Sequence, residues 1–351
     1  MRRILPRDLH LRPLGEITRS WAKLEAAELS PPNLLVCFDA FGTLFRPREP
    51  IAQTYLRKAL ECGAPPAQLN VDLVNSSFRV AFSRNSETYP NYGRASGMRT
   101  NEWWTKVIHD TFRPLLAPHD TVPVDLAPKL FAHFATDAGY LPAATPLPSL
   151  LAALRPPRPG GGPRVVTGVL TNSDDRVPGI LASLRVRVSP LRAGFTPPPD
   201  EIAAHRPCHV DFCALSYDVG ATKPDPGVFR AAEGLAAAAV TAGEGEQDGL
   251  GRWTGGKWEG MARDWVIGDW VRVYVGDEKG KDVKGALAAG WNAVLIDPEG
   301  TSGIVKGLGD GHLRRLSECF AWPAVLAAGG EEPVVLRAKS LSDVLKWLAP
   351  S

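Results

Sequence analysis

The chain has 351 residues, enough for one large domain and a smaller one, and its hydrophobic content of 44% is ordinary for a globular protein. Lysine and arginine total 40 against 38 aspartates and glutamates, a net charge of +2, which indicates neither a nucleic-acid-binding surface nor an acidic tail. No apolar run reaches the roughly 18 to 20 residues that cross a bilayer. We therefore expect neither nucleic acid nor a membrane among its partners.

The cysteine count and the N-terminal residues are used to predict the cellular compartment. Five cysteines are an odd number and form no CxxC pair, so the sequence predicts neither a disulfide framework nor a zinc site. We expect an intracellular protein of the cytoplasm or nucleus. Residues 1–33 are predicted to be a solvated N-terminal extension. Their arginines leave a mitochondrial presequence open as the alternative, although acidic residues among them oppose it. The sequence does not indicate an oligomeric state.

Short apolar segments rich in β-branched residues predict the strands of a parallel sheet. In chain order they are residues 34–38, 165–170, 212–215, 271–275 and 293–296, with a last strand–helix pair within 334–348. Helical stretches between them, such as 149–154 and 282–289, indicate strand–helix–strand crossovers. The predicted fold class is therefore α/β, with a Rossmann-like parallel sheet as its core.

A long segment separates the first two predicted strands. It has more than a hundred residues, too many for a single crossover, and its amphipathic stretches predict helices at 51–62, 71–82 and 101–112. We expect residues 47–141 to form a helical cap, inserted into a core made of residues 34–46 and 142–351.

A second departure from the sheet pattern lies late in the chain. Residues 241–263 contain seven glycines and are expected to form a flexible surface insertion.

Polar clusters follow four of the predicted strands. Because the carboxyl ends of parallel strands meet at one edge of a sheet, we expect these clusters to converge. Asp39 follows an apolar strand directly, as expected of a nucleophile or a metal ligand at that edge. The candidate site residues in these clusters are Asp39, Thr171, Asn172, Lys223, Asp277 and Asp282.

The residue types in these clusters suit a displacement at a carboxylate. Asp39 would attack and form a covalent intermediate, which divides one difficult step into two. Thr171 and Asn172, with backbone N–H groups at the start of the next helix, would bind an anionic group. Lys223 would neutralise charge on the nucleophile and on the transferred group.

Two further carboxylates predict a cation site. Asp277 and Asp282 would supply hard oxygen ligands to Mg²⁺, with water and substrate completing an octahedron.

The four clusters, in this order, resemble the signature motifs of the haloacid dehalogenase superfamily, and the GDxxxxD spacing of Asp277 and Asp282 is their most specific element. The resemblance implies a Rossmann-like core, a helical cap over the strand ends, and a hydrolase with an aspartate nucleophile and a Mg²⁺ cofactor. Residues 89–93, 103–104 and 110–112 resemble the cap of one branch, known as haloacid dehalogenase-like hydrolase domain-containing protein 3.

One residue departs from the pattern of the superfamily's phosphatases. They have a second aspartate two residues after the nucleophile as general acid and base, and here that residue is Phe41. A phenyl ring cannot transfer a proton, and general acid–base help is worth about 10² to 10⁴ in rate, so we expect weak phosphatase turnover. The backbone carbonyl of Phe41 can still bind Mg²⁺ together with Asp39, because that role needs no side chain.

The same residue keeps other functions open. Dehalogenases of the superfamily also lack the second aspartate and have an aromatic residue before Gly-Thr-Leu, as in residues 41–44. They work without a metal, whereas residues 276–282 are acidic, and they carry a cap arginine that residues 62–77 lack. The favoured hypothesis is a Mg²⁺-dependent hydrolase acting on a small phosphorylated or similarly anionic substrate. A 2-haloacid dehalogenase and a non-catalytic binding protein of this fold are the alternatives.

Several of these residues also have a purely structural interpretation. Asp39 before Gly-Thr could form a turn, and Asp282 could cap the following helix. Asp174 and Arg176 are expected to form an exposed ion pair or a structural brace rather than to be catalytic. Trp104, like its neighbour in the sequence, is expected to pack in the core of the cap.

Overall fold

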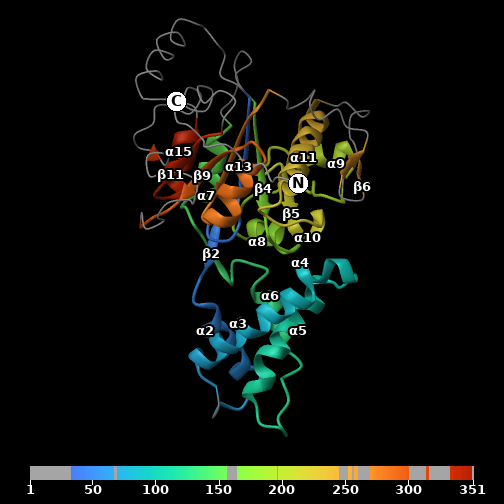
Figure 1. Cartoon of the computed structure of the whole chain (residues 1–351), viewed down its shortest axis with the longest axis vertical. Coiled ribbons are helices and arrows are strands. Elements are labelled where there is room, and N and C mark those ends of the chain that lie inside the picture. The colour runs from blue at the N-terminus through green and yellow to red at the C-terminus, as the bar shows by residue number, and fades with distance from the viewer. Residues whose placement is uncertain are drawn as a thin grey trace, which may run out of the picture.

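A parallel sheet forms the centre of the molecule (Figure 1). The computed structural model describes residues 33–66, 69–155, 164–195, 197–244, 252–254, 257–259, 269–299, 314–315 and 333–349. Within these residues, seven strands pair in the order β10-β11-β9-β8-β1-β4-β5, and every pairing is parallel. They are β1 (Leu34–Phe38), β4 (Val165–Thr171), β5 (Phe212–Leu215), β8 (Val271–Gly276), β9 (Asn292–Ile296), β10 (Arg314–Arg315) and β11 (Val335–Ala338). The predicted α/β fold is confirmed.

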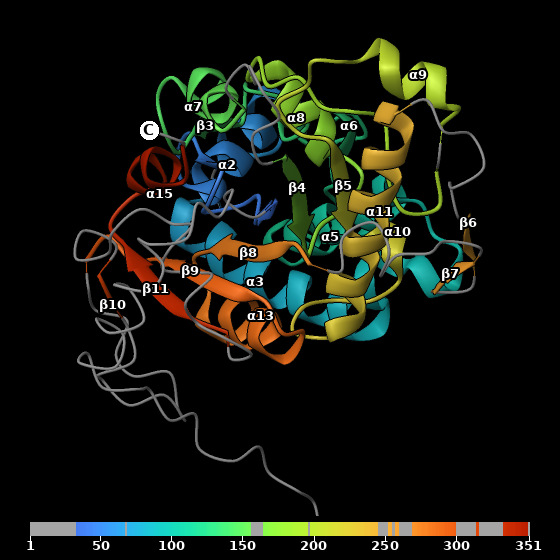
Figure 2. The same ribbon diagram turned by 90° about the horizontal axis from the view of Figure 1, so that it is seen from above.

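Helices cover both faces of the sheet (Figure 2), which is why its strands are apolar throughout. Every residue of β1 is buried, and alternate residues contribute to two separate hydrophobic clusters. Leu34, Val36 and Phe38 share one cluster with residues of α7 (Leu147–Ala153), α8 (Val177–Ser183) and α15 (Leu341–Leu348). The opposite cluster contains residues of α9 (Pro199–Ala204), α11 (Pro226–Glu244) and α13 (Lys284–Ala288).

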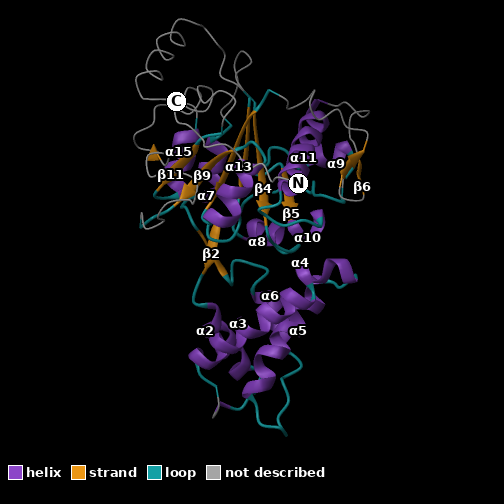
Figure 3. Cartoon of the chain, in the orientation of Figure 1, coloured by secondary structure: helices purple, strands orange, loops and turns teal. Residues whose placement is uncertain are grey.

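A group of helices lies beyond the carboxyl ends of the strands, in the lower half of Figures 1 and 3. Its members are α2 (Ile51–Glu61), α3 (Val71–Thr88), the short α4 (Pro90–Gly93), α5 (Thr100–Phe112) and α6 (Leu126–His133), with 3₁₀ turns at Arg94–Ser96 and Arg113–Leu115. The short α10 (Ser216–Val219), which follows β5, packs against α4. We call residues 51–133 the helical segment.

A two-stranded ribbon joins the helical segment to the sheet. β2 (Phe45–Pro47) pairs antiparallel with β3 (Tyr140–Pro142), so the chain leaves and returns at one place. The rings of Phe45 and Tyr140 lie 5.0 Å apart there. The apolar cluster on the β1 face continues through these rings into the helical segment, so the two parts share one core.

Parts of the expected extension and insertion lie outside the described residues. These parts are residues 1–32, 245–251, 255–256 and 260–263. Helix α11 extends to Glu244, so the segment expected to be an insertion begins within a helix. Farther on, β6 (Arg252–Thr254) and β7 (Lys257–Glu259) pair antiparallel. In the part of the chain that the structure describes, no helix is long and apolar enough to span a membrane.

Gly168 offers a test of the sheet packing. It lies in β4 beside Phe212 of β5, and a Cβ atom at this position would lie 2.2 Å from the Phe212 ring. We expect Gly168→Ala to lower the free energy of unfolding by about 1–3 kcal/mol, the usual cost of overpacking, and to shift the midpoint of urea unfolding accordingly. Gly179→Ala on α8 is the control, because its Cβ would meet no atom closer than 3.6 Å. Equal midpoints for the two variants would contradict this packing.

Candidate active site

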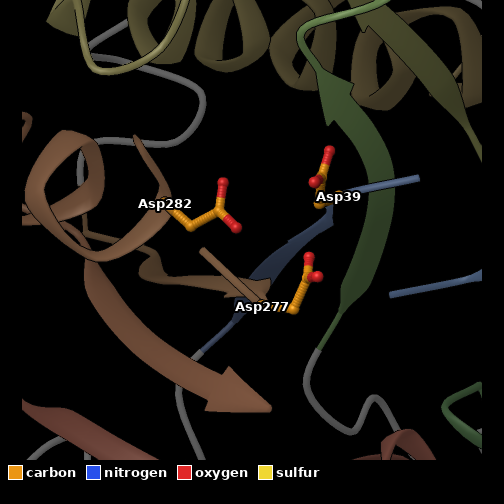
Figure 4. A group of neighbouring side chains, drawn as sticks. All are labelled: Asp39, Asp277 and Asp282. Atoms are coloured by element: carbon orange, nitrogen blue, oxygen red, sulfur yellow. The ribbon is translucent and has the colours of Figure 1, made fainter. Parts of the chain in front are cut away.

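Three carboxylates converge at the carboxyl ends of β1 and β8 (Figure 4). Asp39 directly follows β1, Asp277 directly follows β8, and Asp282 belongs to a π-helical turn at Lys279–Val283. One oxygen from each carboxylate lies within 4.8 Å of the others. Asp39 and Asp282 are buried, whereas Asp277 is exposed. Residues separated by more than 230 positions in the chain are therefore brought together by the strand order.

Two glycines allow the backbone to approach these carboxylates. A Cβ atom on Gly42 would lie 2.2 Å from Asp277 Oδ2, and one on Gly276 would lie 2.2 Å from Asp282 Oδ2. Gly42 also has a φ of +81°, a left-handed conformation that favours glycine. Thr43 Oγ1 donates a hydrogen bond to Asp277 Oδ1 at 3.2 Å. The turn after β1 thus shapes the surroundings of a carboxylate from another strand.

Lys223 is the cation of this cluster. Its Nζ lies 3.0 Å from Asp39 Oδ1 and donates hydrogen bonds to Asp282 Oδ1 at 2.7 Å and to the hydroxyl of Tyr274 at 2.6 Å. Only 1% of the Lys223 side chain is exposed. Burial acts to lower the pKa of Lys223, but the charges of Asp39 and Asp282 outweigh it and raise that pKa. Lys223 is therefore a buried, positively charged partner of both carboxylates.

The cluster keeps an excess of negative charge. Desolvation, with the charges of Asp39 and Asp282, raises the pKa of Asp277 to about 6. Burial, with the charge of Asp39, also raises the pKa of Asp282, although Lys223 opposes that effect. One lysine cannot balance three ionised carboxylates, so the arrangement favours a further cation.

Asn172 holds the backbone of Lys223. Its Oδ1 accepts a hydrogen bond from Lys223 N at 2.7 Å, and its Nδ2 donates one to Lys223 O at 3.0 Å. Both ends of the amide, predicted to bind substrate, are thus engaged by the protein, and the contacts favour a positioning role for Asn172. Thr171 is buried at the end of β4, and within the described residues its hydroxyl makes no hydrogen bond. The Thr171 hydroxyl is therefore available to a ligand.

The Phe41 ring belongs to the apolar junction rather than to the carboxylate cluster. It packs edge-on against Phe45, with ring centroids 4.8 Å apart, and against Tyr140 at 5.6 Å. Within the described part of the chain, no hydrogen bond to the Phe41 carbonyl oxygen is found. The carbonyl is therefore free for another ligand, whereas the side chain faces apolar neighbours.

A cavity of about 310 Å³ lies between the helical segment and the sheet. Nine of its sixteen lining residues are aromatic, four are aliphatic, and the remaining three are Asn172, Ser173 and Arg176. Asp39 does not line it, but Asn172 does, and the amide of Asn172 is bonded to the backbone of Lys223. The cavity and the carboxylate cluster are therefore linked through Asn172 and Lys223.

Asp174 and Arg176 form the expected brace, but it is buried and reaches the helical segment. Arg176 donates to Asp174 through Nε at 3.0 Å and through Nη2 at 2.8 Å. Trp104 Nε1 donates to the same carboxylate at 2.6 Å, and the Arg176 guanidinium lies 4.6 Å from the Trp104 ring centroid. Trp104 was expected in the cap core, yet it lines the cavity, whereas the adjacent Trp103 is buried. Adjacent residues of a helix point about 100° apart, so Trp103 and Trp104 face different sides of α5.

The role of Asn172 can be tested through stability. We expect Asn172→Ala to lower the free energy of unfolding by about 1–3 kcal/mol, because it leaves the Lys223 backbone N–H and carbonyl without partners. Asn75→Ala on α3 is the control, since within the described residues its amide makes no hydrogen bond. Urea unfolding of both variants measures the difference. A loss no larger than that of Asn75→Ala would show that the two bonds do not hold Lys223.

Comparisons with known proteins agree with the motifs, although no family model matches the chain. The haloacid dehalogenase-like hydrolase domain-containing protein 3 of Danio rerio is 29% identical over 202 residues, 56% of this chain and 69% of that protein. A protein of Schizosaccharomyces pombe named as an uncharacterized hydrolase is 28% identical over 195 residues, 56% of this chain and 70% of the relative. The crystal structure of a 2-haloacid dehalogenase from Pseudomonas syringae pv. tomato covers 90% of this chain and 98% of that chain, at 18% identity and a TM-score of 0.44. The resemblance inferred from the motifs is confirmed, since the chain is similar in sequence to proteins named as haloacid dehalogenase-like hydrolases.

Proposed function

We propose that the protein is a Mg²⁺-dependent hydrolase that transfers a phosphoryl group from a small anionic substrate to Asp39 and then to water. The observation that carries the proposal is the position of Lys223 Nζ, 3.0 Å from Asp39 and 2.7 Å from Asp282, in a cluster of three carboxylates. A buried ammonium in this place holds the nucleophile and neutralises charge that develops on the transferred group.

In the first step an Asp39 oxygen attacks phosphorus, and the bond from phosphorus to the leaving oxygen breaks. In the second step water attacks the acyl phosphate, which releases inorganic phosphate and restores the carboxylate. Lys223 and the free hydroxyl of Thr171 would bind phosphoryl oxygens, with backbone N–H groups at the end of β4. No side chain at position 41 protonates the leaving oxygen, so its proton comes from water.

The residues present fit a Mg²⁺ ion. Asp39, Asp277 and the carbonyl of Phe41 would hold it, since all are hard oxygen ligands. Asp282 would act through water or through Lys223, because its Oδ1 accepts from Lys223 and its Oδ2 accepts from Glu278 N at 2.8 Å. When bound, Mg²⁺ supplies positive charge between the nucleophile and an anionic substrate, which would otherwise repel each other.

We further propose that residues 47–141 act as a cap over this site. Several of their side chains bond to the sheet part: Tyr92 Oη donates to Asn172 O at 3.2 Å, and Asn91 Nδ2 donates to Ser216 O at 2.7 Å. A cap of this kind excludes water and selects substrates.

Phe41 supports a 2-haloacid dehalogenase as the second candidate. Halide leaves without a proton, so that reaction does not need the missing general acid. The apolar cavity beside Phe41 would suit the carbon chain of a haloacid. The acidic excess around Asp277 favours the metal-dependent reaction instead.

Metal uptake tests the proposed Mg²⁺ site. Calorimetric titration should show Mg²⁺ binding by the wild type and binding weaker by about tenfold or more in Asp277→Ala, which removes one of the few carboxylate ligands. Gly42→Ala should weaken binding as well, because its Cβ would displace Asp277 Oδ2. Gly63→Ala is the matched control: its φ is +86°, but no atom lies within 4 Å of the added Cβ. Equal uptake by wild type and Asp277→Ala would falsify the metal site.

Restoring an acid at position 41 tests the reaction class. We expect Phe41→Asp to raise Mg²⁺-dependent phosphate release from alkyl phosphates by about 10² to 10⁴, the usual worth of general acid–base catalysis. The wild type should show slow, Mg²⁺-dependent release from the same panel. Chloride release from chloroacids in the presence of a chelator would instead establish the dehalogenase. A wild type silent on every compound, with an active Phe41→Asp variant, would establish a non-catalytic binding protein.

A further inference from the structure

The cavity beside the site contains no charge free to bind an ionic group. Arg176 is its one charged lining residue among those described. That guanidinium is held by both oxygens of Asp174 and lies over the rings of Trp104 at 4.6 Å and Phe131 at 5.1 Å. A second phosphate, a carboxylate or an amine would lose its hydration here without gaining a partner. The cavity therefore selects an uncharged group.

Its size and walls favour a single ring. A volume of about 310 Å³ is at the lower end of small-molecule sites, which span about 300 to 1,000 Å³. Nine aromatic side chains line it, and aromatic rings pack well against other rings in edge-to-face contact. Tyr55 and Tyr140 are among them, and within the described residues neither hydroxyl makes a hydrogen bond. The cavity therefore has apolar walls and two tyrosine hydroxyls that are available to hydrogen-bond one neutral polar substituent.

The absence of a general acid at position 41 restricts the leaving group of the substrate. With Phe41 in place, the leaving oxygen must depart as an anion and take its proton from water. A phenol ionises near pH 10, as tyrosine does, whereas an alcohol is about as weak an acid as water, near 15.7. A phenolate therefore leaves readily without help and an alkoxide does not.

Both constraints apply to the leaving group of the substrate, because Phe41 lines the cavity and also occupies the position of the general acid. We propose that the substrate is an aryl phosphate whose uncharged, ring-sized phenolic part occupies the cavity while its phosphoryl group meets Asp39. This deepens the proposed function and rests on it. The Asp39 oxygen bonds to phosphorus, the bond to the phenolic oxygen breaks, and the phenolate takes a proton from water.

Matched substrates separate the two constraints. Phenyl and cyclohexyl phosphate have similar shapes but different leaving groups, and kcat for phenyl phosphate should be higher by about 10² or more. Phenyl and 4-carboxyphenyl phosphate differ in charge within the cavity, and KM should rise about tenfold or more for the carboxylate. Acetyl phosphate is the reference, since its leaving group needs neither acid nor cavity.

Variants of the cavity wall test its part directly. Ile108→Trp should lower the ratio of phenyl to acetyl phosphate turnover at least tenfold, and Ile108→Ala should raise turnover of 1-naphthyl relative to phenyl phosphate. Val80→Trp, at an exposed position of α3, should leave both ratios unchanged. Calorimetry measures the affinity for phenyl phosphate without turnover in the Asp39→Asn variant and in the double variant Asp39→Asn with Ile108→Trp, and so gives the same comparison.

The outcomes distinguish a failure of this inference from a failure of the proposed hydrolase function. Turnover of acetyl phosphate with no preference for phenyl over cyclohexyl phosphate, or with equal KM for the carboxylated ring, overturns the aryl phosphate and keeps the hydrolase. Unchanged ratios in both Ile108 variants overturn the placement of the phenolic part in the cavity and keep the hydrolase. No turnover of acetyl phosphate or of any ester overturns both proposals.

Discussion

The site depends on the burial of one ammonium group among carboxylates. A buried lysine is costly unless it is paired, and here the pairing involves every element around the site. Asp39 comes from the end of β1, Asp282 from the turn after β8, and the Asn172 amide after β4 fixes the Lys223 backbone. Because these partners follow separate strands, the contacts form only when β1, β4 and β8 lie side by side. The same contacts leave the cluster short of positive charge, which is the physical reason to expect a divalent cation.

Phe41 is part of a larger apolar structure. Its ring contacts Phe45 and Tyr140, which lie on the two strands joining the sheet to the helical segment. An aromatic residue at this position, the packed ribbon and the apolar cavity are therefore consistent with one another, and together they suit a leaving group that needs no proton.

The strands were predictable because a two-sided parallel sheet requires continuous apolar runs. Residues 34–38 and 212–215 match the ends of β1 and β5, and convergence of the carboxylates follows from parallel topology. Helix α11 was missed because its alanine-rich sequence has few polar residues to mark an exposed face. The Tyr274 contact was missed because a tyrosine within a strand signals only β propensity. The bond of Asn172 to backbone could not be foreseen, since an amide serves a ligand or a loop equally well.

The cavity could not be derived from the sequence because its walls come from five helices, the ribbon and the end of β4. Its link to Lys223 passes through Tyr92, which lines the cavity and donates to Asn172 O, while the amide of Asn172 holds the backbone of Lys223. Asn91 and Tyr92 reach this position with φ values of +50° and +59°. A left-handed non-glycine residue costs of order 1–3 kcal/mol and persists only where its surroundings enforce it. Contacts across the helical segment and the strand ends therefore sustain this turn. A group bound in the cavity would lie against Tyr92, which also contacts Asn172, the residue that holds the backbone of Lys223.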